Sequence, residues 1–136
     1  MNTLKVVIDT NVFVSGLFFN GPPFRILRAW QNGQFRMAVS EEIIDEYRRV
    51  IESLTQKLGD IDLDAVLERL VIDAEMVAGY SFEQPVCEDP DDDKFLACAM
   101  LSKSQYLVSG DKHLLKLGTF LETAIVTPRH FLDNLL

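Results

Sequence analysis

Four acidic residues lie far apart in this sequence, and each stands where an apolar segment meets a turn. Asp9 follows LKVVI, Glu46 lies within SEEIIDEYRRV, Asp92 lies within DPDDDKFLACA, and Asp111 follows YLVSG. Carboxylates gathered at partly buried positions repel one another and raise one another's pKa unless a positive charge lies among them. A divalent metal ion supplies that charge, so we expect the four acids to form a metal site.

The expected ligands are all oxygens, with no clustered histidine or cysteine, which favours Mg²⁺ or Mn²⁺ over Zn²⁺. One or two such ions, the two about 3.5 to 4 Å apart, can activate water and stabilise the charge that develops as a phosphodiester is cleaved. The chemistry indicated is hydrolytic phosphoryl transfer. Taken singly, Asp92 or Asp111 could be a helix N-cap and Glu46 a solvated helix residue, so the prediction rests on all four acids together.

Helical periodicity selects two of these acids from among their neighbours. Glu46 lies on the flank of the apolar stripe of its segment, whereas the charged residues around it point away. Asp92 precedes three apolar residues, of which Phe95 is the first, by three, four and seven positions, which centres it on the buried face of a helix. Asp93 falls to one side of that face and is the second choice.

Strand and helix patterns alternate along the chain. Strands are expected at residues 4–8, 35–39, 106–109 and 124–126, with 85–87 either a strand or an extended link. Helices are expected at 24–32, from Ser40 to 54, at 63–77, 91–103 and 111–117, and from Pro128 onward, with a loop over 16–24. The helix over 63–77 is expected to turn Val66, Leu67, Leu70, Val71 and Ala74 inward.

This alternation predicts a three-layer α/β/α, Rossmann-like fold with a central parallel sheet. Ligands of such sheets bind beyond the carboxyl ends of the strands. Asp9 and Asp111 each follow an expected strand, so both should project from that same edge.

Composition limits the class of protein. The 136 residues, 48% of them hydrophobic, suffice for one well-packed domain, and no Gly-, Ser- or Pro-rich stretch divides residues 1–136. Cys87 and Cys98 lack CxxC spacing and nearby histidines, so neither a zinc site nor a disulfide is expected, and a reducing cytoplasm fits best. Without 18 consecutive apolar residues or a signal-peptide pattern, we expect neither a membrane span nor export.

The net charge of −8 at pH 7 opposes the approach of a polyanion. A nucleic-acid substrate would therefore be held by a local basic rim rather than by the field of the whole protein. The candidates for this rim are Arg25, Arg28, Arg48, Arg49, Lys94, Lys112, His113 and Lys116. Solvated surface charge is the simpler explanation of these residues.

At the four acids the chain resembles the PIN domain family of metal-dependent ribonucleases, and most of all the bacterial PIN proteins that are toxin components of toxin–antitoxin pairs. VVIDTNVFVSGLF is similar to the opening strand motif of the family, SEEIIDEYRRV to its second-acid helix, DPDDDKFLACA to its third motif and YLVSGDKHLL to its fourth. The motifs stand in the expected order and cover nearly the whole chain. The resemblance implies catalytic metal ligands at Asp9, Glu46, Asp92 and Asp111, Mg²⁺ or Mn²⁺ as cofactor, and RNA as substrate.

The resemblance also implies that Thr10, Asn11 and Ser109 support the acids by hydrogen bonds. Thr10 and Ser109 could instead simply satisfy turn amides. Asp93, a further supporting residue, stands where this subgroup often has an amide or another polar residue, which agrees with the choice of Asp92 by helical periodicity. A cognate antitoxin is the implied protein partner.

Two other classes of protein share parts of this pattern. One is a non-catalytic module whose acidic cleft binds a basic partner segment, such as an arginine of an antitoxin. The other is a phosphoacceptor receiver domain, which needs a second acid beside Asp9 and a lysine that ends a late strand, and the sequence does not meet these needs.

We also expect a homodimer or higher homo-oligomer. Phe18, Phe19 and Trp30 are candidate interface residues, although core packing explains them more simply.

Overall fold

The structure, a computed structural model, describes residues 4–136 and has a six-stranded sheet. The strands are β1 (Lys5–Ile8), β2 (Arg36–Ser40), β3 (Glu75–Val77), β4 (Tyr106–Val108), β5 (Thr119–Phe120) and β6 (Thr123–Val126). Their order is β3-β2-β1-β4-β6-β5, and all neighbours are parallel except β5 with β6. The predicted central parallel sheet is confirmed, with a short antiparallel edge strand that the sequence did not predict.

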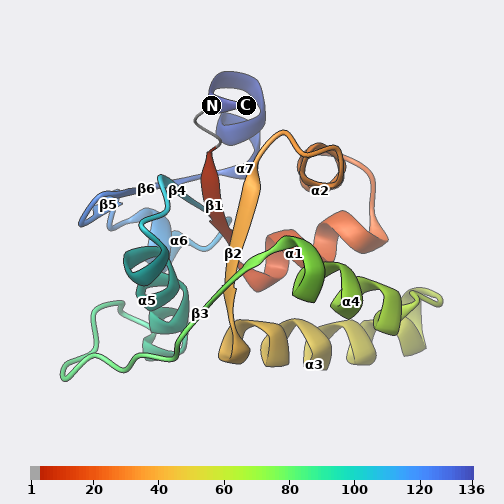
Figure 1. The fold of residues 1–136 in the computed structure, drawn as a ribbon, viewed down its shortest axis with the longest axis horizontal. Coiled ribbons are helices and arrows are strands. Elements are labelled where there is room, and N and C mark those ends of the chain that lie inside the picture. Colours follow the sequence, from red (N-terminus) through yellow and green to blue (C-terminus); the bar gives the residue numbers. More distant parts are fainter. Residues whose placement is uncertain (1–3) are drawn as a thin grey trace.

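Helices cover the sheet on both sides (Figure 1). They are α1 (Thr10–Phe18), α2 (Pro22–Gln31), α3 (Glu41–Leu58), α4 (Leu63–Asp73), α5 (Asp93–Ser102), α6 (Lys112–Leu115) and α7 (Pro128–His130), with a 3₁₀ turn at Pro90–Asp92 and a π-helix at Phe131–Leu135. Helix α5 contacts β1 to β4 on one face, and α1 to α4 gather on the other. This arrangement is the predicted three-layer α/β/α fold.

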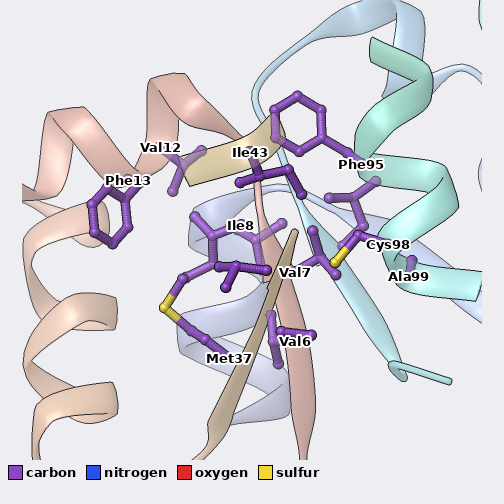
Figure 2. Close-up of a cluster of buried hydrophobic side chains, with 14 of the residues drawn as sticks. Val6, Val7, Ile8, Val12, Phe13, Met37, Ile43, Phe95, Cys98 and Ala99 are labelled. Atoms are coloured by element: carbon purple, nitrogen blue, oxygen red, sulfur yellow. The ribbon is translucent and has the colours of Figure 1, made fainter. Parts of the chain in front are cut away.

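Strand β1 is the centre of the core. Val6, Val7 and Ile8 are fully buried. Figure 2 shows side chains of α5, among them Phe95, on one side of this strand and Phe13 of α1 on the other. Burying one such side chain stabilises a protein by about 1.5 to 3 kcal/mol. A strand covered on both faces needs apolar side chains at every position, and residues 6–8 meet this need. Asp9 is the first polar residue after this buried strand.

Helix α3 begins as predicted. The Ser40 hydroxyl accepts a hydrogen bond from the Ile43 N–H at 3.3 Å, and acidic side chains occupy the first turn, where the helix dipole stabilises them. The fully buried Tyr47 donates its hydroxyl proton to the Ile8 carbonyl at 2.5 Å. This bond ties α3 to the last residue of β1 and brings Glu46, the preceding residue, close to the strand end.

Strands β1 and β4 end level with each other. Ile8 pairs with Val108, and the Asp9 N–H donates to the Val108 carbonyl at 3.0 Å. Asp9 and Ser109 therefore follow side by side at the carboxyl edge. Strand β2 lies beside β1 in one direction along the sheet, and β4 lies beside β1 in the opposite direction. The strand order therefore reverses at the carboxyl ends of β1 and β4. Open parallel sheets form their ligand crevices at such points.

The helix expected over 63–77 is too long. Helix α4 ends at Asp73, and Glu75–Val77 instead forms β3, which pairs with β2. Leu70 is fully buried as predicted, but Val71 is 67% exposed and does not face inward. No glycine or proline marks the change, and pairing of the backbone with β2 overrides the local helical pattern.

The structure corrects the expectation for one connecting segment and decides between the two alternatives for another. Residues 16–24 are not one loop, because α1 extends to Phe18 and α2 begins at Pro22. A proline is tolerated in the first helical turn, where its missing N–H has no partner to lose. The segment 85–87, which could have been a strand, is a link without strand structure.

Candidate active site

A cleft of about 210 Å³ lies at the carboxyl edge of the sheet. Its lining consists of Asp9, Thr10, Asn11, Glu46, Arg49, Val50, Asp92, Phe95 and Asp111. All four acids singled out in the sequence are present, and they come from the end of β1, from α3, from the turn before α5 and from the segment after β4. The structure thus brings together carboxylates that are separated by up to about a hundred residues.

Asp9 is the most buried of the four acids, with 4% of its surface exposed. Its Oδ1 accepts a hydrogen bond from the Val12 N–H at 2.9 Å, which caps α1, and its Oδ2 accepts one from the Ser109 hydroxyl. Burial raises the pKa of this carboxyl, and these two hydrogen bonds lower it in part. Ser109 also accepts the Asp111 N–H at 2.9 Å, so a single hydroxyl fixes two of the acids.

Asp92 has the most perturbed pKa of the four acids, raised to about 7 from the ordinary value of 3.8. Burial is the main cause, and the charge of Asp111 is the next. The Asp92 carboxylate caps no helix amide, whereas Asp111 Oδ1 accepts the His113 N–H at 2.7 Å and caps α6. Helix capping therefore explains in part why an acid stands at position 111, but it does not explain the acid at Asp92.

His113 stands within the acidic cluster. Asp92, Asp111 and His113 each offer a ligand atom, and these atoms lie within 4.8 Å of one another. The Cys87 thiol also lies 4.0 Å from Asp92 Oδ2. The expectation that no histidine or cysteine accompanies the acids is therefore wrong. His113 follows Asp111 by two residues, and the fold brings Asp92 close to both.

Glu46 is held by two partners. Its Oε2 accepts a hydrogen bond from the Thr10 hydroxyl, and its Oε1 forms an ion pair with Lys94 Nζ at 2.5 Å. The side chains of Glu46 and Lys94 are only 17% and 10% exposed. Sequence periodicity found the inward position of Glu46 but missed Lys94 as its partner, because the two residues lie on different helices.

The remaining predicted supporting residues have different surroundings. Asp93 does not line the cleft. Its two carboxylate oxygens instead accept hydrogen bonds from the N–H groups of Val86 and Cys87, at 3.0 and 2.7 Å. It therefore anchors the segment before α5. Asn11 is exposed at the mouth of the cleft.

The expected basic rim is sparse. Of its eight candidates, Arg49 lines the cleft, and Lys94 and His113 are engaged with the acids. Arg48 and Lys116 form exposed ion pairs with Asp45 and Glu88. Such surface pairs contribute little to stability and leave the cationic head accessible.

The donor set fits a divalent cation. Two carboxylates and an imidazole lie close enough together to contact one ion, with Asp9 beside them. Burial and the charge of Asp111 raise the pKa of Asp92, and a cation between the two carboxylates would offset both effects.

Comparison with known proteins identifies the fold family. The PIN domain family matches residues 5–113, which include all four acids. The chain belongs to the PIN domain family. PIN domains are in general nucleases.

Relatives of this PIN domain extend over nearly its whole length. An uncharacterized protein of Methanocaldococcus jannaschii is 28% identical over 142 residues, which cover 96% of this chain and 91% of that protein. Two crystal structures are similar in fold, each with a TM-score of 0.59. PAE2754 of Pyrobaculum aerophilum is 13% identical, with 96% of this chain and 87% of that one covered. VapBC2 of Rickettsia felis, bound to a DNA fragment from their promoter, is 12% identical, with 91% and 98% covered.

Within residues 4–136, none of the helices is both long and apolar enough to cross a membrane.

Proposed function

We propose that this PIN domain is a divalent-metal-dependent endoribonuclease with Asp9, Glu46, Asp92 and Asp111 as its catalytic acids. The observation that carries the proposal is the convergence of these acids at one cleft. A purely structural use of four carboxylates would not place them together, because their repulsion costs stability.

Asp92, Asp111 and His113 would hold the cation, with Asp9 on its buried side. When bound, Mg²⁺ or Mn²⁺ would activate a water and neutralise charge on the scissile phosphate. The imidazole of His113 favours Mn²⁺, because nitrogen ligands suit transition metals better than Mg²⁺. Asp92 gives up its proton when a cation binds, since a ligating carboxylate must be ionised.

The other residues position these groups. Ser109 donates to Asp9 and accepts from the backbone of Asp111, which fixes the orientation of both acids before substrate arrives. Thr10 does the same for Glu46. Arg49 offers a positive charge at the cleft for a substrate phosphate. RNA as the substrate rests on the resemblance of the four motifs to ribonucleases of the family.

We further propose that the chain is the toxin of a toxin–antitoxin pair. The similarity in fold to a chain of the VapBC2 complex supports this role. The net charge of −8 suits a basic antitoxin partner. Co-purification with the product of a neighbouring gene, with cleavage inhibited in the complex, is the expected result; unchanged cleavage in the presence of that product would contradict the toxin role.

A homodimer is also proposed, and exposed apolar side chains support it. Val71, Ile72 and Phe19 are 67%, 69% and 53% exposed. Trp30, another aromatic candidate for an interface, is instead buried in the core. Light scattering after size exclusion should give twice the chain mass of 15.4 kDa. A monomer at micromolar concentration would contradict this part of the proposal.

The enzymatic proposal is tested by incubating labelled RNA with the purified protein in Mn²⁺, with and without a chelator. Cleavage should require the metal and should be lost in Asp9→Asn, while Asp45→Asn, which changes an exposed acid of α3, should cleave at the original rate. Metal-independent cleavage, or full activity in Asp9→Asn, would contradict the assignment.

A second function has one observation in its favour. Glu46 already holds a cationic side chain, Lys94, so the cleft could instead bind an arginine or lysine of a partner without catalysis. In that case the protein would bind a basic peptide but would not cleave RNA in Mn²⁺. The same assay therefore separates the two functions.

A further inference from the structure

Lys94 is a cation built into the acidic site. Its ammonium group lies 2.5 Å from Glu46 Oε1, and its side chain is 10% exposed. Removing a lysine from water is costly unless an opposite charge compensates it. Glu46 provides that compensation, and the Lys94 ammonium also lies 5.9 Å from the centre of the Phe95 ring. The ammonium is therefore held at one place rather than extended into solvent.

The ion pair lies outside the group of possible ligands that contains His113. The ligand atoms that lie within 4.8 Å of one another belong to Asp92, Asp111 and His113, and Glu46 does not share in this group. Glu46 lies instead beside Asp9, because Thr10, the next residue along the chain, donates its hydroxyl proton to Glu46. The site thus combines a group of three possible metal ligands with a separate carboxylate that is already paired with a cationic side chain.

The charge of Lys94 bears on how many cations the site can hold. Its ammonium group already compensates Glu46, one of the four carboxylates. A second divalent ion near Glu46 would have to displace the ammonium group or lie against it. Two positive charges a few ångströms apart in a partly buried site repel each other strongly.

We propose that Lys94 stands in place of a second metal ion, so that this PIN domain binds one divalent cation, at Asp92, Asp111 and His113. The inference rests on the proposed metal-dependent function and specifies its stoichiometry. Lys94 is then a positioning residue that compensates the charge of Glu46 and fixes its orientation, rather than a simple link between α3 and α5.

The test counts bound Mn²⁺ by calorimetric titration and by electron paramagnetic resonance of the metal. The wild-type protein should bind one ion, with a spectrum free of Mn²⁺–Mn²⁺ coupling. Lys94→Met, which keeps the length and apolar stem but removes the charge, should bind two ions and show that coupling. Adding Glu46→Gln to Lys94→Met should return the count to one, because the second ion then lacks its carboxylate.

Two control variants make the result specific. Lys94→Arg keeps the positive charge and should still bind one ion. Lys112→Met removes an exposed lysine beside Asp111 and should also bind one. If Lys94→Met does not fold, Lys94→Gln removes the charge while retaining a hydrogen-bond donor and should bind two ions.

The outcomes separate this inference from the proposed function. Two ions in the wild-type protein, or one ion in a folded Lys94→Met or Lys94→Gln variant, would overturn the role of Lys94 while leaving a metal-dependent nuclease intact. No Mn²⁺ uptake by the wild-type protein would overturn both.

Discussion

Replacing Asp92 by asparagine is expected to stabilise the metal-free protein while it ends cleavage. In the wild-type protein, burial and the charge of Asp111 raise the pKa of Asp92 from 3.8 to about 7. At about 1.36 kcal/mol per pKa unit, this shift corresponds to at most about 4 kcal/mol of destabilisation above pH 7. Asp92 is half-buried, so solvent screening reduces the expected gain from the asparagine to roughly 1 to 2 kcal/mol.

The pH dependence gives the sign of the effect. A carboxyl whose pKa is higher in the folded state than in the unfolded state binds its proton more tightly when folded. The wild-type protein is therefore most stabilised by this group below pH 3.8 and loses that stability as the pH rises through about 7. Asp92→Asn has no such proton to lose, so its advantage should be near zero at pH 4 and reach its full value at pH 8.

Urea unfolding of both proteins in chelator, at pH 4 and pH 8, measures this difference. Asp91→Asn is the matched control, because Asp91 is an exposed acid one position away. RNA cleavage in Mn²⁺ should be lost in Asp92→Asn and retained in Asp91→Asn. A destabilised Asp92→Asn at pH 8, or an advantage that does not change with pH, would refute the reasoning that burial and the charge of Asp111 disfavour ionised Asp92.

Three further predictions concern the site and its scaffold. Mn²⁺ affinity should rise by up to about tenfold per pH unit below 7 and then level off, because Asp92 must release its proton; calorimetry in buffers of different ionisation enthalpy measures that release. Ser109→Ala removes a hydrogen-bond donor to Asp9 and should lower metal affinity or activity by about 10- to 100-fold. Ser104→Ala, which changes another buried serine, is the control and should keep the original activity. Unchanged activity in Ser109→Ala would contradict its positioning role. Gly16→Ala should lower the free energy of unfolding by about 1 to 3 kcal/mol, because the added Cβ would lie 2.6 Å from Leu27 Cδ1 and 2.8 Å from the Pro23 carbonyl oxygen; wild-type stability in denaturant would contradict it.

Much of the fold could be predicted because local patterns and tertiary structure agree. The apolar run before Asp9 predicted a strand buried on both faces, and β1 is buried in that way. Ser40 predicted the start of α3, and its hydroxyl caps that helix. Where they disagree, prediction failed: Glu75–Val77 continues a helical pattern, but backbone pairing with β2 makes it a strand.

The candidate site could be predicted in part for the same reason. Periodicity placed Glu46 on an inward position because a helix face is a local property, and Glu46 lines the cleft. Asp92 also lines the cleft, but it lies in the 3₁₀ turn before α5 and not on the face of the predicted helix. The contact of Lys94 with Glu46 and that of His113 with Asp92 depend on how separate segments come together, which the sequence does not show. Both residues had been grouped with the surface cations, whereas the structure shows them engaged with the acids.

Anomalous diffraction from a crystal soaked in Mn²⁺ tests the central claim most directly, because it locates the ion rather than inferring it from activity. A manganese peak in contact with the carboxylates of Asp92 and Asp111 is predicted. No peak in the cleft of a well-occupied soak, or manganese bound only at other acids of the surface, would contradict the account.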